Sequence, residues 1–543
     1  MNKKYIVGGL VFWAGLSGYM GLRILESYTE DAVFAALSAV PAQAQEIRYS
    51  FLRNTLTLKG VEYELPDDKI MHKGTMESVE VTGFNRKCMF VKPNMPAYDP
   101  DALPIVAESV TVTGIVDTVH AGHTKMEQRV ERAHLRGWHQ RLGMLLDQHS
   151  QHNGEASFFE ELYRCSLDGM ELSGVTSSVS GPYRQPMRIS VAEMALPEGI
   201  RAPRGTEKVP SASLRISGAA VAGKSFSGGV QQLDLENLRV LEPAAMAEFL
   251  RLNRALDTAE PNRMSANDGD EFIDRLFELT AKNYENRVPF SRAAVQGGTL
   301  SVMDAPGGSE VFSLNMALKS LNCTMSDTGD GGFREAVTLD GLKVTLPDAG
   351  MFADIFSRYA PDGITLNMSG DATAGARNLS GKVRYELEGL GALEGDLDVS
   401  GDIRALRKAS MENVPDDTLD ELMQTLRLGR LHLTYRDAGL VPMGLELAAR
   451  WKFDTPEEML AEALVLVKML EQSPERPVRE LGRALAEQLA APGEFSMTIA
   501  PEQPMNFMEA LSLASGNPDA LPVTLASKPG TKAVKDYLPG ERK

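Results

Sequence analysis

An uncharged apolar run of 18 residues, Tyr5–Leu22, constrains the fold of this chain more than any other feature. A helix of this length rises roughly 27 Å, which is close to the hydrocarbon thickness of a bilayer. Two lysines precede the run, whereas Glu26, Glu30 and Asp31 follow it. Because excess positive charge stays on the cytoplasmic side, the sequence predicts a single membrane span, with the N-terminus cytoplasmic and residues 26–543 on the outer side of that membrane.

A cleaved secretory signal is the alternative interpretation, because a basic start and an apolar core are both present. A signal peptidase site follows the apolar core closely. The nearest A-x-A pattern, Ala42-Gln43-Ala44, lies about 20 residues beyond it. The sequence therefore favours an anchor that is retained, over residues 1–25.

The rest of the chain has the composition of a folded protein. Apolar residues make up 43% of the 543 residues and charged residues 24%, which are ordinary values for globular domains. A chain of this length is expected to form about two to four domains. The formal net charge of −18 argues against nucleic acid as a partner, because phosphate contacts need a concentrated Lys/Arg surface.

The three cysteines, Cys88, Cys165 and Cys323, are far apart in the sequence. Their odd number and wide spacing exclude a disulfide framework and a C-x-x-C motif. Separately buried thiols are the favoured interpretation, because free cysteine is a common small core residue. Whether one disulfide forms among the three stays open.

From Ile47 onward, apolar residues alternate with a period of two, which is typical of β-strands. In three segments, Val79–Phe84, Ile105–Ile115 and Cys165–Val175, apolar residues two positions apart precede a glycine and then another apolar residue. The expected fold class is mainly β with α (α+β). A transmembrane helix precedes tandem antiparallel β-rich units that form an open curved sheet or groove, with helical insertions and a helical C-terminal region.

One face of this sheet is expected to be apolar, because period-two alternation places a set of aliphatic side chains on the same side of their strands. Helices, a second sheet or a ligand must cover this face. The helices expected in the first half of the chain are too few to do so. The candidate groove residues are Leu56, Leu58, Val79, Val81, Val110, Val112, Leu233, Leu235 and Leu339.

Two segments at an offset of 104 residues indicate a tandem duplication. LDLENLRVLEPAAMAEFL, from Leu233, and VTLDGLKVTLPDAGMFAD, from Val337, align without gaps. In both segments a strand ends at a proline, Pro243 or Pro347, that suits the first turn of a helix. A polar linker, Asp257–Asp270, separates the copies. Chance agreement of two alternating patterns is the alternative.

A helical insertion is expected near residues 120–163, because Val130, His134 and Trp138 recur at helical spacing within 125–148. Imidazoles bind zinc or copper, yet no H-E-x-x-H occurs, and the two histidines inside the helical pattern would lie on different faces. A solvated insertion is favoured, and no metal ligand is predicted. Six of the eight histidines fall in this region: His120, His123, His134, His139, His149 and His152.

The C-terminal part changes to a helical pattern over Val441–Ala491. A strand, Glu494–Ile499, and a short helix near Phe507–Leu513 follow, and the polar tail from Pro529 is predicted to be flexible. The expected domains are 1–25 (anchor), 26–262 (first β-rich region), 263–437 (second β-rich region), 438–528 (helical region) and 529–543 (tail).

Enzyme motifs do not occur in a suitable context. Neither G-x-S-x-G nor S-x-x-K is found at a strand-to-helix turn that would expose an activated hydroxyl. The glycine-rich stretch Gly389–Gly395 lies among strands and lacks the following helix that a phosphate loop needs, so turns explain it better. We therefore predict no catalytic residue and no cofactor.

A basic N-terminus, one span, a short helix and strands of the form FLRNTLTLKGVEY (Phe51–Tyr63) resemble the entry to AsmA-like and YdgA-like envelope proteins of Gram-negative bacteria. The resemblance implies a periplasmic β-rich groove associated with phospholipid movement and outer-membrane homeostasis. The chain is therefore expected to be a non-enzymatic anchored protein that handles lipid or supports envelope assembly.

The expected partners are the inner membrane, through residues 5–22, and lipid acyl chains or another envelope protein in the periplasm. Two alternative functions stay open. One is an anchored scaffold or assembly factor that binds an envelope protein. The other is a metal-dependent hydrolase that uses the histidine-rich insertion.

Overall fold

The chain divides into two compact units, Met1–Arg251 and Leu252–Lys543. The second unit contains both the stretch expected as a second β-rich region and the helical region after it. The computed structural model describes residues 42–67, 70–85, 105–121, 124–139, 166–181, 184–201, 210–239, 288–304, 312–328, 332–346, 350–411 and 416–538, with a few positions in 27–34 and 242–248.

The apolar run Tyr5–Leu22, the linker Asp257–Asp270, Cys88 and Cys165 lie outside the described residues. Within the described part of the chain, no helix combines the length and apolarity needed to cross a membrane. The described positions between 27 and 34 are helical, as expected for a short helix that precedes the first strand.

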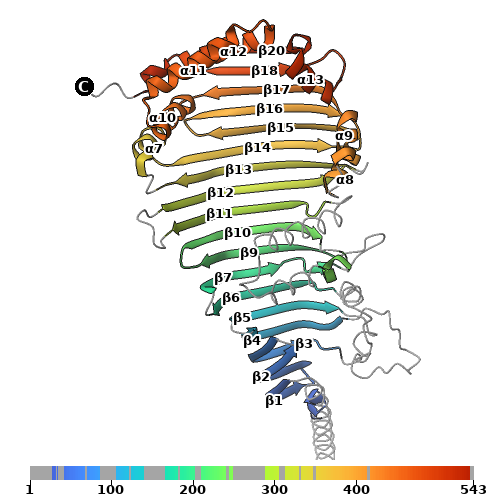
Figure 1. Cartoon of the computed structure of the whole chain (residues 1–543). Coiled ribbons are helices and arrows are strands. Elements are labelled where there is room, and N and C mark those ends of the chain that lie inside the picture. The colour runs from blue at the N-terminus through green and yellow to red at the C-terminus, as the bar shows by residue number, and fades with distance from the viewer. Residues whose placement is uncertain are drawn as a thin grey trace, which may run out of the picture. The chain divides into compact units, whose positions relative to one another are not determined.

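The first unit is one antiparallel sheet in which sequence neighbours are also spatial neighbours, from β1 through β7 and on to β9 and β10 (Figure 1). The two-residue strand β8 pairs only with the start of β9. The strands are β1 (Ala42–Ser50), β2 (Thr55–Asp67), β3 (Ile70–Thr82), β4 (Ile105–Ala121), β5 (Thr124–His139), β6 (Gly169–Gly181), β7 (Arg184–Leu196), β8 (Ile200–Arg201), β9 (Ser211–Ala222) and β10 (Phe226–Arg239).

A row of residues with positive φ explains why glycine interrupts the apolar alternation. On β2, Leu56 and Leu58 pack with Val61, so the alternation slips by one residue at Gly60, whose φ is 58°. Such a φ is easy only for glycine. A slip in one strand alone would turn its later side chains to the other face. Glycines with positive φ recur on β4, β6 and β9, at Gly114, Gly174 and Gly218.

The neighbouring strand slips in the same row, so the pairing stays in register. On β3, Met76 packs with Val79 in the same cluster, which places the slip of this strand at Glu77. Residues on either side remain paired without a shift, since Lys59 faces Ser78 and Val61 faces Met76. Leu56, Leu58 and Val61 of β2 therefore lie on one face together with Met76, Val79 and Val81 of β3.

Tyr63 lies on the same face of β2, two residues beyond Val61. Its ring lies over Gly74 of β3, where a Cβ atom would be only 2.2 Å from Tyr63 Cζ, and its hydroxyl donates to Asp117 Oδ1 of β4 at 2.9 Å. Burial, and secondly the hydrogen bond to Asp117, raise the pKa of Tyr63 from its ordinary value of 10.0 to about 12.

We expect the Tyr63 hydroxyl to ionise at a higher pH than the hydroxyl of an exposed tyrosine. Because the raised pKa favours the neutral phenol, its stabilising effect is complete below pH 10 and is lost as the pH rises from 10.0 towards about 12. Tyrosinate absorbance during alkaline titration checks this, with the spectrum of Tyr63→Phe subtracted. A difference curve with its midpoint near pH 10 would contradict the buried hydrogen bond.

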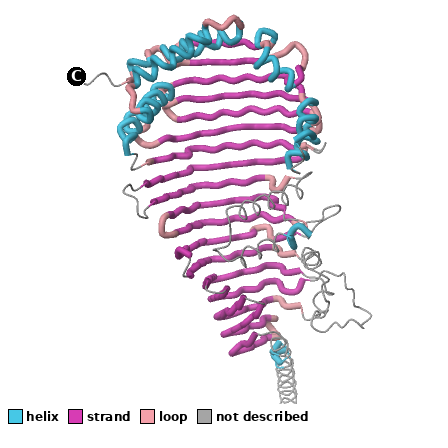
Figure 2. Tube along the Cα trace, viewed as in Figure 1, coloured by secondary structure: helices cyan, strands magenta, loops and turns pink. Residues whose placement is uncertain are grey.

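The second unit is another antiparallel ladder, from β11 through β18 to β20, with β19 paired to the start of β17 (Figures 1 and 2). The strands are β11 (Arg292–Asp304), β12 (Phe312–Asp327), β13 (Phe333–Thr345), β14 (Ile364–Ala374), β15 (Asn378–Leu387), β16 (Gly391–Ser400), β17 (Arg427–Asp437), β18 (Glu494–Ile499), β19 (Met505–Asn506) and β20 (Val523–Lys528).

Helices of the second unit lie at the ends of the strands and beyond the last strand (Figure 2). They are η1 (Gly350–Phe352), α7 (Ala353–Tyr359), α8 (Ile403–Met411), α9 (Asp416–Thr425), α10 (Leu440–Lys452), α11 (Pro456–Glu471), α12 (Arg476–Ala490), α13 (Phe507–Gly516), η2 (Pro518–Ala520) and η3 (Val534–Asp536).

Two apolar clusters fix these helices to the two rims of the sheet. At one rim, Ile355 of α7 and Met443 of α10 pack with Leu390 from the turn between β15 and β16. At the other rim, Ile403 of α8 and Ala510 of α13 belong to a cluster with residues of β14, β16 and β17. The middle of the sheet is left between these two rims.

The predicted strands of the second unit and the helices from α10 to α13 are confirmed, and β18 has the expected bounds. The predicted flexible tail is wrong for 529–538. Val534 is 1% exposed, and Leu538 is also buried. Polar residues surround these two apolar residues in the sequence, so the sequence pattern does not reveal them. In the structure they pack as part of the second unit.

The predicted helix within 125–148 is wrong for Lys125–His139, which belongs to strand β5. The spacing of four residues suits a helix face but does not define a face of β5, because His134 pairs with Thr111 in a polar row whereas Val130 pairs with Ile115. In β5, Leu135 faces Val110 and Ala133 faces Val112, so this segment continues the sheet instead of crossing it. Residues 140–165 lie outside the described residues.

The two aligned segments share one backbone feature. Asn237 of β10 and Gly341 of β13, which are 104 positions apart, both have positive φ, 51° and 63°. The pairing register shifts at each, between Leu235 and Leu238 on β10 and at the equivalent positions of β13. Asparagine and glycine are the residues that tolerate this conformation best. Helical residues follow both strands, at 244–248 and in α7.

Candidate functional site

Cross-strand rows of apolar side chains run over one face of the first unit. Each row contains one residue from each successive strand, directly opposite its neighbours. One row is Tyr49, Leu56, Val81, Val110, Leu135, Met170 and Leu196. The next is Ile47, Leu58, Val79, Val112, Ala133, Leu172, Met194, Ile216 and Leu233.

The other face of the same strands is polar. At the strand positions between the two apolar rows, the side chains point to the opposite face and carry charged, hydroxyl and imidazole groups. In this polar row, Thr111 Oγ1 lies 2.9 Å from His134 Nδ1. The row is Arg48, Thr57, Glu80, Thr111, His134 and Glu171. A sheet with one polar and one apolar face needs a cover on the apolar face only.

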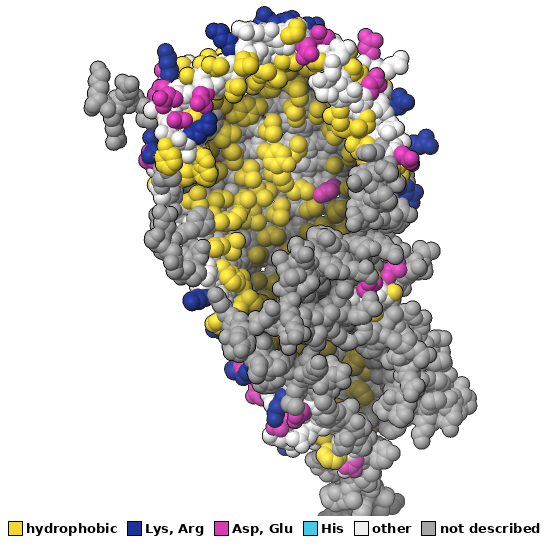
Figure 3. Space-filling model, in the orientation of Figure 1, with side chains coloured by type: hydrophobic (Ala, Val, Ile, Leu, Met, Phe, Trp, Pro, Cys, Tyr) yellow, Lys and Arg dark blue, Asp and Glu magenta, His cyan; other side chains and the backbone are white. Residues whose placement is uncertain are grey.

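The second unit has the same two-faced construction. An apolar row crosses eight strands: Val295, Leu321, Leu339, Met368, Tyr385, Leu393, Tyr435 and Phe495. On the other face, Arg384 and Arg436 both donate to Glu394, and Arg436 also donates to Glu494, which links the four strands β15 to β18 by ion pairs. Figure 3 shows apolar side chains lining the hollowed face of this unit between its helical rims.

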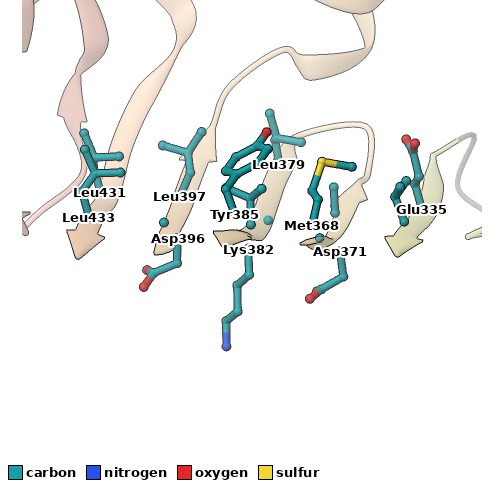
Figure 4. A pocket seen from close by; sticks show the side chains of 16 residues that line it. Glu335, Met368, Asp371, Leu379, Lys382, Tyr385, Asp396, Leu397, Leu431 and Leu433 are labelled. Atoms are coloured by element: carbon teal, nitrogen blue, oxygen red, sulfur yellow. The ribbon is translucent and has the colours of Figure 1, made fainter. Parts of the chain in front are cut away.

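Three glycines deepen the middle of this apolar face. Gly370 and Gly395 both lie opposite Val383, and Gly381 lies between Ala372 and Leu397. They leave a hollow of about 470 Å³ that is lined by aliphatic side chains and Tyr385. In Figure 4 the leucines, Met368 and Tyr385 point to one side of the strands, whereas Asp371, Lys382 and Asp396 point to the other.

This apolar face is open to its surroundings. Tyr385 and Leu393, which face each other across β15 and β16, are each 40% exposed. The helices at the two rims pack against the ends of the strands and do not cover Tyr385 and Leu393. An exposed apolar surface of this kind marks a binding surface more often than a free surface.

One acidic side chain lies on the apolar side of the hollow. Glu335 points the same way as the leucines in Figure 4, and it pairs with Ala372 and Met325 in the ladder. Nearby, burial and, to a smaller degree, Glu335 raise the pKa of the Cys323 thiol, which is free. A reactive thiolate is therefore disfavoured at Cys323.

The structure divides the nine candidate groove residues among three places. Six of them, from Leu56 to Val112, form neighbouring positions of the two rows on β2, β3 and β4. Leu233 and Leu235 lie on β10, and Leu339 belongs to the apolar row of the second unit. Leu56, Leu58 and Val110 are buried within the unit, so they support the sheet and are not its accessible surface.

Tyr385 and Leu393, the most exposed residues of the apolar row of the second unit, are absent from the sequence-based set. They lie in the stretch that the sequence shows as a glycine-rich hairpin. The alternation of Val383, Tyr385 and Leu387 with charged residues is a signal that could have identified them. The hollow itself depends on which glycines face each other, and this requires the pairing register.

Of the six histidines, His123, His149 and His152 lie outside the described residues. Among the described residues, no group of three or more His, Cys, Asp or Glu side chains could hold a metal ion. His120 pairs with Met71 and Lys125, and His139 Nε2 lies 3.8 Å from Asp168 Oδ2. His134 and His139 lie on strand β5 and not on a helix.

A family model described only as an uncharacterized protein matches residues 384–528, from β15 to the end of β20. The matched segment includes part of the hollow and helices α8–α13. A comparison with curated proteins gave no match.

Proposed function

We propose that this chain is a non-enzymatic, membrane-anchored periplasmic protein whose apolar sheet face holds lipid acyl chains and thereby supports lipid handling in the cell envelope. The carrying observation is the row through Met368, Tyr385 and Leu393, which is apolar across the ladder and 40% exposed at its middle. The resemblance to AsmA-like and YdgA-like proteins supports the same proposal.

The energetics of such a face suit acyl chains. Each buried methylene contributes about 0.8 kcal/mol of binding free energy, so an acyl chain of ordinary length can be held by apolar contact alone. Around the hollow, the hydrogen-bonding groups on the apolar side are few, chiefly the carboxylate of Glu335 and the hydroxyl of Tyr385. Binding of this kind discriminates weakly among head groups and requires no catalytic constellation.

Photoreactive lipid labelling of the full chain in its membranes tests this proposal. Phospholipids with a photoreactive acyl chain should form adducts on peptides from β14 to β16. Leu393→Glu, alone and together with Met368→Glu, is expected to abolish these adducts, because a charge interrupts the row. Thr338→Glu, on the polar face, is the matched control and should keep them. Undiminished labelling of folded Leu393→Glu and Met368→Glu protein would refute the proposal.

The proposed anchor is tested by topology. With Tyr5–Leu22 as a retained span, a C-terminal alkaline phosphatase fusion should be active, because the enzyme folds only outside the cytoplasm. The mature protein should also keep its first residues in N-terminal sequencing. An inactive fusion, or a mature N-terminus near Gln45, would contradict the anchored topology.

A further inference from the structure

Helices α10 and α11 carry an exposed apolar surface that the groove does not use. Its side chains are between 61% and 85% exposed, which is far more than the apolar face of the sheet. They are Trp451, Phe453, Val465, Leu466 and Met469. We call this set the tip patch.

Helix α11 is apolar on both of its sides. Val467 is buried, and Gly482 of α12 lets the two helices approach closely, since a Cβ atom there would lie 2.6 Å from Glu471 N. Val465, Leu466 and Met469 remain on the outer side. Glu458 and Glu462 lie on the outer side nearer the start of the helix, so the exposed apolar stretch is confined to its second half. An exposed apolar stretch of this kind marks an interaction site.

The aromatic residues at the end of α10 extend the same surface. Lys452 Nζ donates to Glu462 Oε2 at 3.0 Å, which holds the end of α10 beside the middle of α11. Val465 and Leu466 follow Glu462 by three and four residues, so they lie on the same helix face. Trp451 and Phe453 are the chain neighbours of Lys452, so they lie near this end of the helix pair.

Phe453 gives an independent sign of function. It caps α10 with φ 61° and ψ 32°, a left-handed conformation that favours glycine, and its side chain is 85% exposed. A phenylalanine at this position is unfavourable both for the backbone and for solvation. Side chains kept under such conditions cluster at binding sites.

We propose that the tip patch inserts into the interfacial layer of a lipid bilayer. Ala463–Leu470 is too short to span a membrane, but a helix with Leu, Val and Met beside Trp and Phe suits shallow insertion. Basic Lys452 and Lys468 are offset by nearby glutamates, so the charges favour a zwitterionic lipid surface over an anionic one.

The position of the patch in the second unit fits such a membrane contact. Helix α12, on which α11 packs, is fixed to the last strands of the ladder, because Gln488 Nε2 donates to Glu494 O and Ser527 Oγ. A bilayer on the tip patch would thus lie at the end of the apolar rows. The proposal rests on the patch alone and does not require the groove to bind lipid.

Fluorescence of Trp451 tests it in the full chain. The chain holds three tryptophans, and Trp13→Phe with Trp138→Phe leaves Trp451 as the reporter. The protein is reconstituted in phosphatidylcholine vesicles with brominated or unbrominated acyl chains. Brominated chains should quench most of the Trp451 emission. Val465→Glu with Leu466→Glu should remove the quenching, whereas Leu511→Glu, a half-exposed position on α13, should keep it.

The variant Phe453→Gly tests whether a loss of quenching could result from misfolding instead of from the loss of membrane contact. Glycine suits the left-handed cap, so this variant should melt at a higher temperature and still lose part of the quenching. Unquenched Trp451 in the parent, or equal quenching in the Val465→Glu, Leu466→Glu protein, would overturn the proposal. Unquenched protein that forms chain-to-chain crosslinks at the patch would assign the surface to a second copy. Lipid adducts in the groove should persist in every patch variant, which separates this test from that of the groove.

Discussion

Val110→Asp is expected to destabilise the first unit by about 3–5 kcal/mol, the cost of an uncompensated charge in a buried site. Val110 is 9% exposed and lies directly between Val81 and Leu135 in an apolar row. A carboxylate there has apolar neighbours on both adjacent strands. Hydrogen exchange of peptides from β3 to β5 measures the effect, because it reports the stability of this unit separately from the second.

Ser109→Asp is the matched control for this prediction. Ser109 is the preceding residue on β4 and faces Arg136 on the polar side, so a carboxylate gains a basic neighbour there. We expect its exchange rates to stay within the range of the unaltered protein. Equal protection in the Val110→Asp protein would show that this row is solvated and would remove the basis for a two-faced sheet.

Glu446→Leu is expected to destabilise the second unit by about 1.5–3 kcal/mol, because it removes a buried carboxylate that accepts charge-assisted hydrogen bonds from the partly exposed Arg358. Glu446 is 4% exposed, and Arg358 Nη1 donates to its two carboxylate oxygens at 2.6 and 2.5 Å. The Tyr359 hydroxyl also donates to it, at 2.7 Å. This carboxylate therefore joins α7 to α10 at one rim of the apolar face.

The double variant Glu446→Leu with Arg358→Leu decides whether the ion pair is the cause. Replacing both charges leaves no unpaired group in the rim, so most of the lost stability should return. Urea unfolding followed by the exchange of α7 and α10 peptides measures each variant. If the double variant is as unstable as Glu446→Leu alone, packing around Glu446, and not its charge, holds the rim together.

Period-two alternation predicted the strands well, because each face of the sheet has one polarity. It failed at β5, where Val130, His134 and Trp138 recur at helical spacing although the segment is a strand. Only the partners decide between the two structures: β4 and β6 pair with this segment on either side. The tail failed for a related reason, since two apolar residues among polar ones gain their burial from distant parts of the chain.

The groove was predicted as a property of one face, but its accessible part was not. Leu56 and Leu58 are as apolar as Leu393, yet they are buried in a cluster with the helix before β1, whereas Leu393 stays exposed. Burial depends on which elements cover which strands, and this is not written in the local pattern. Glycines such as Gly370 and Gly395 likewise form a hollow only because the register places both against Val383.

The most direct test of the lipid-binding face uses neighbouring residues of β15 and β16. A photoreactive benzoylphenylalanine is placed, one position at a time, at Val383, Tyr385 or Leu393 on the apolar face and at Arg384 or Glu394 on the polar face, in cells whose phospholipids carry radioactive phosphate. If acyl chains occupy the apolar face, irradiation should label the chain at the first three positions and leave it unlabelled at the last two. Equal labelling on both faces, or none at Tyr385 and Leu393, would contradict it.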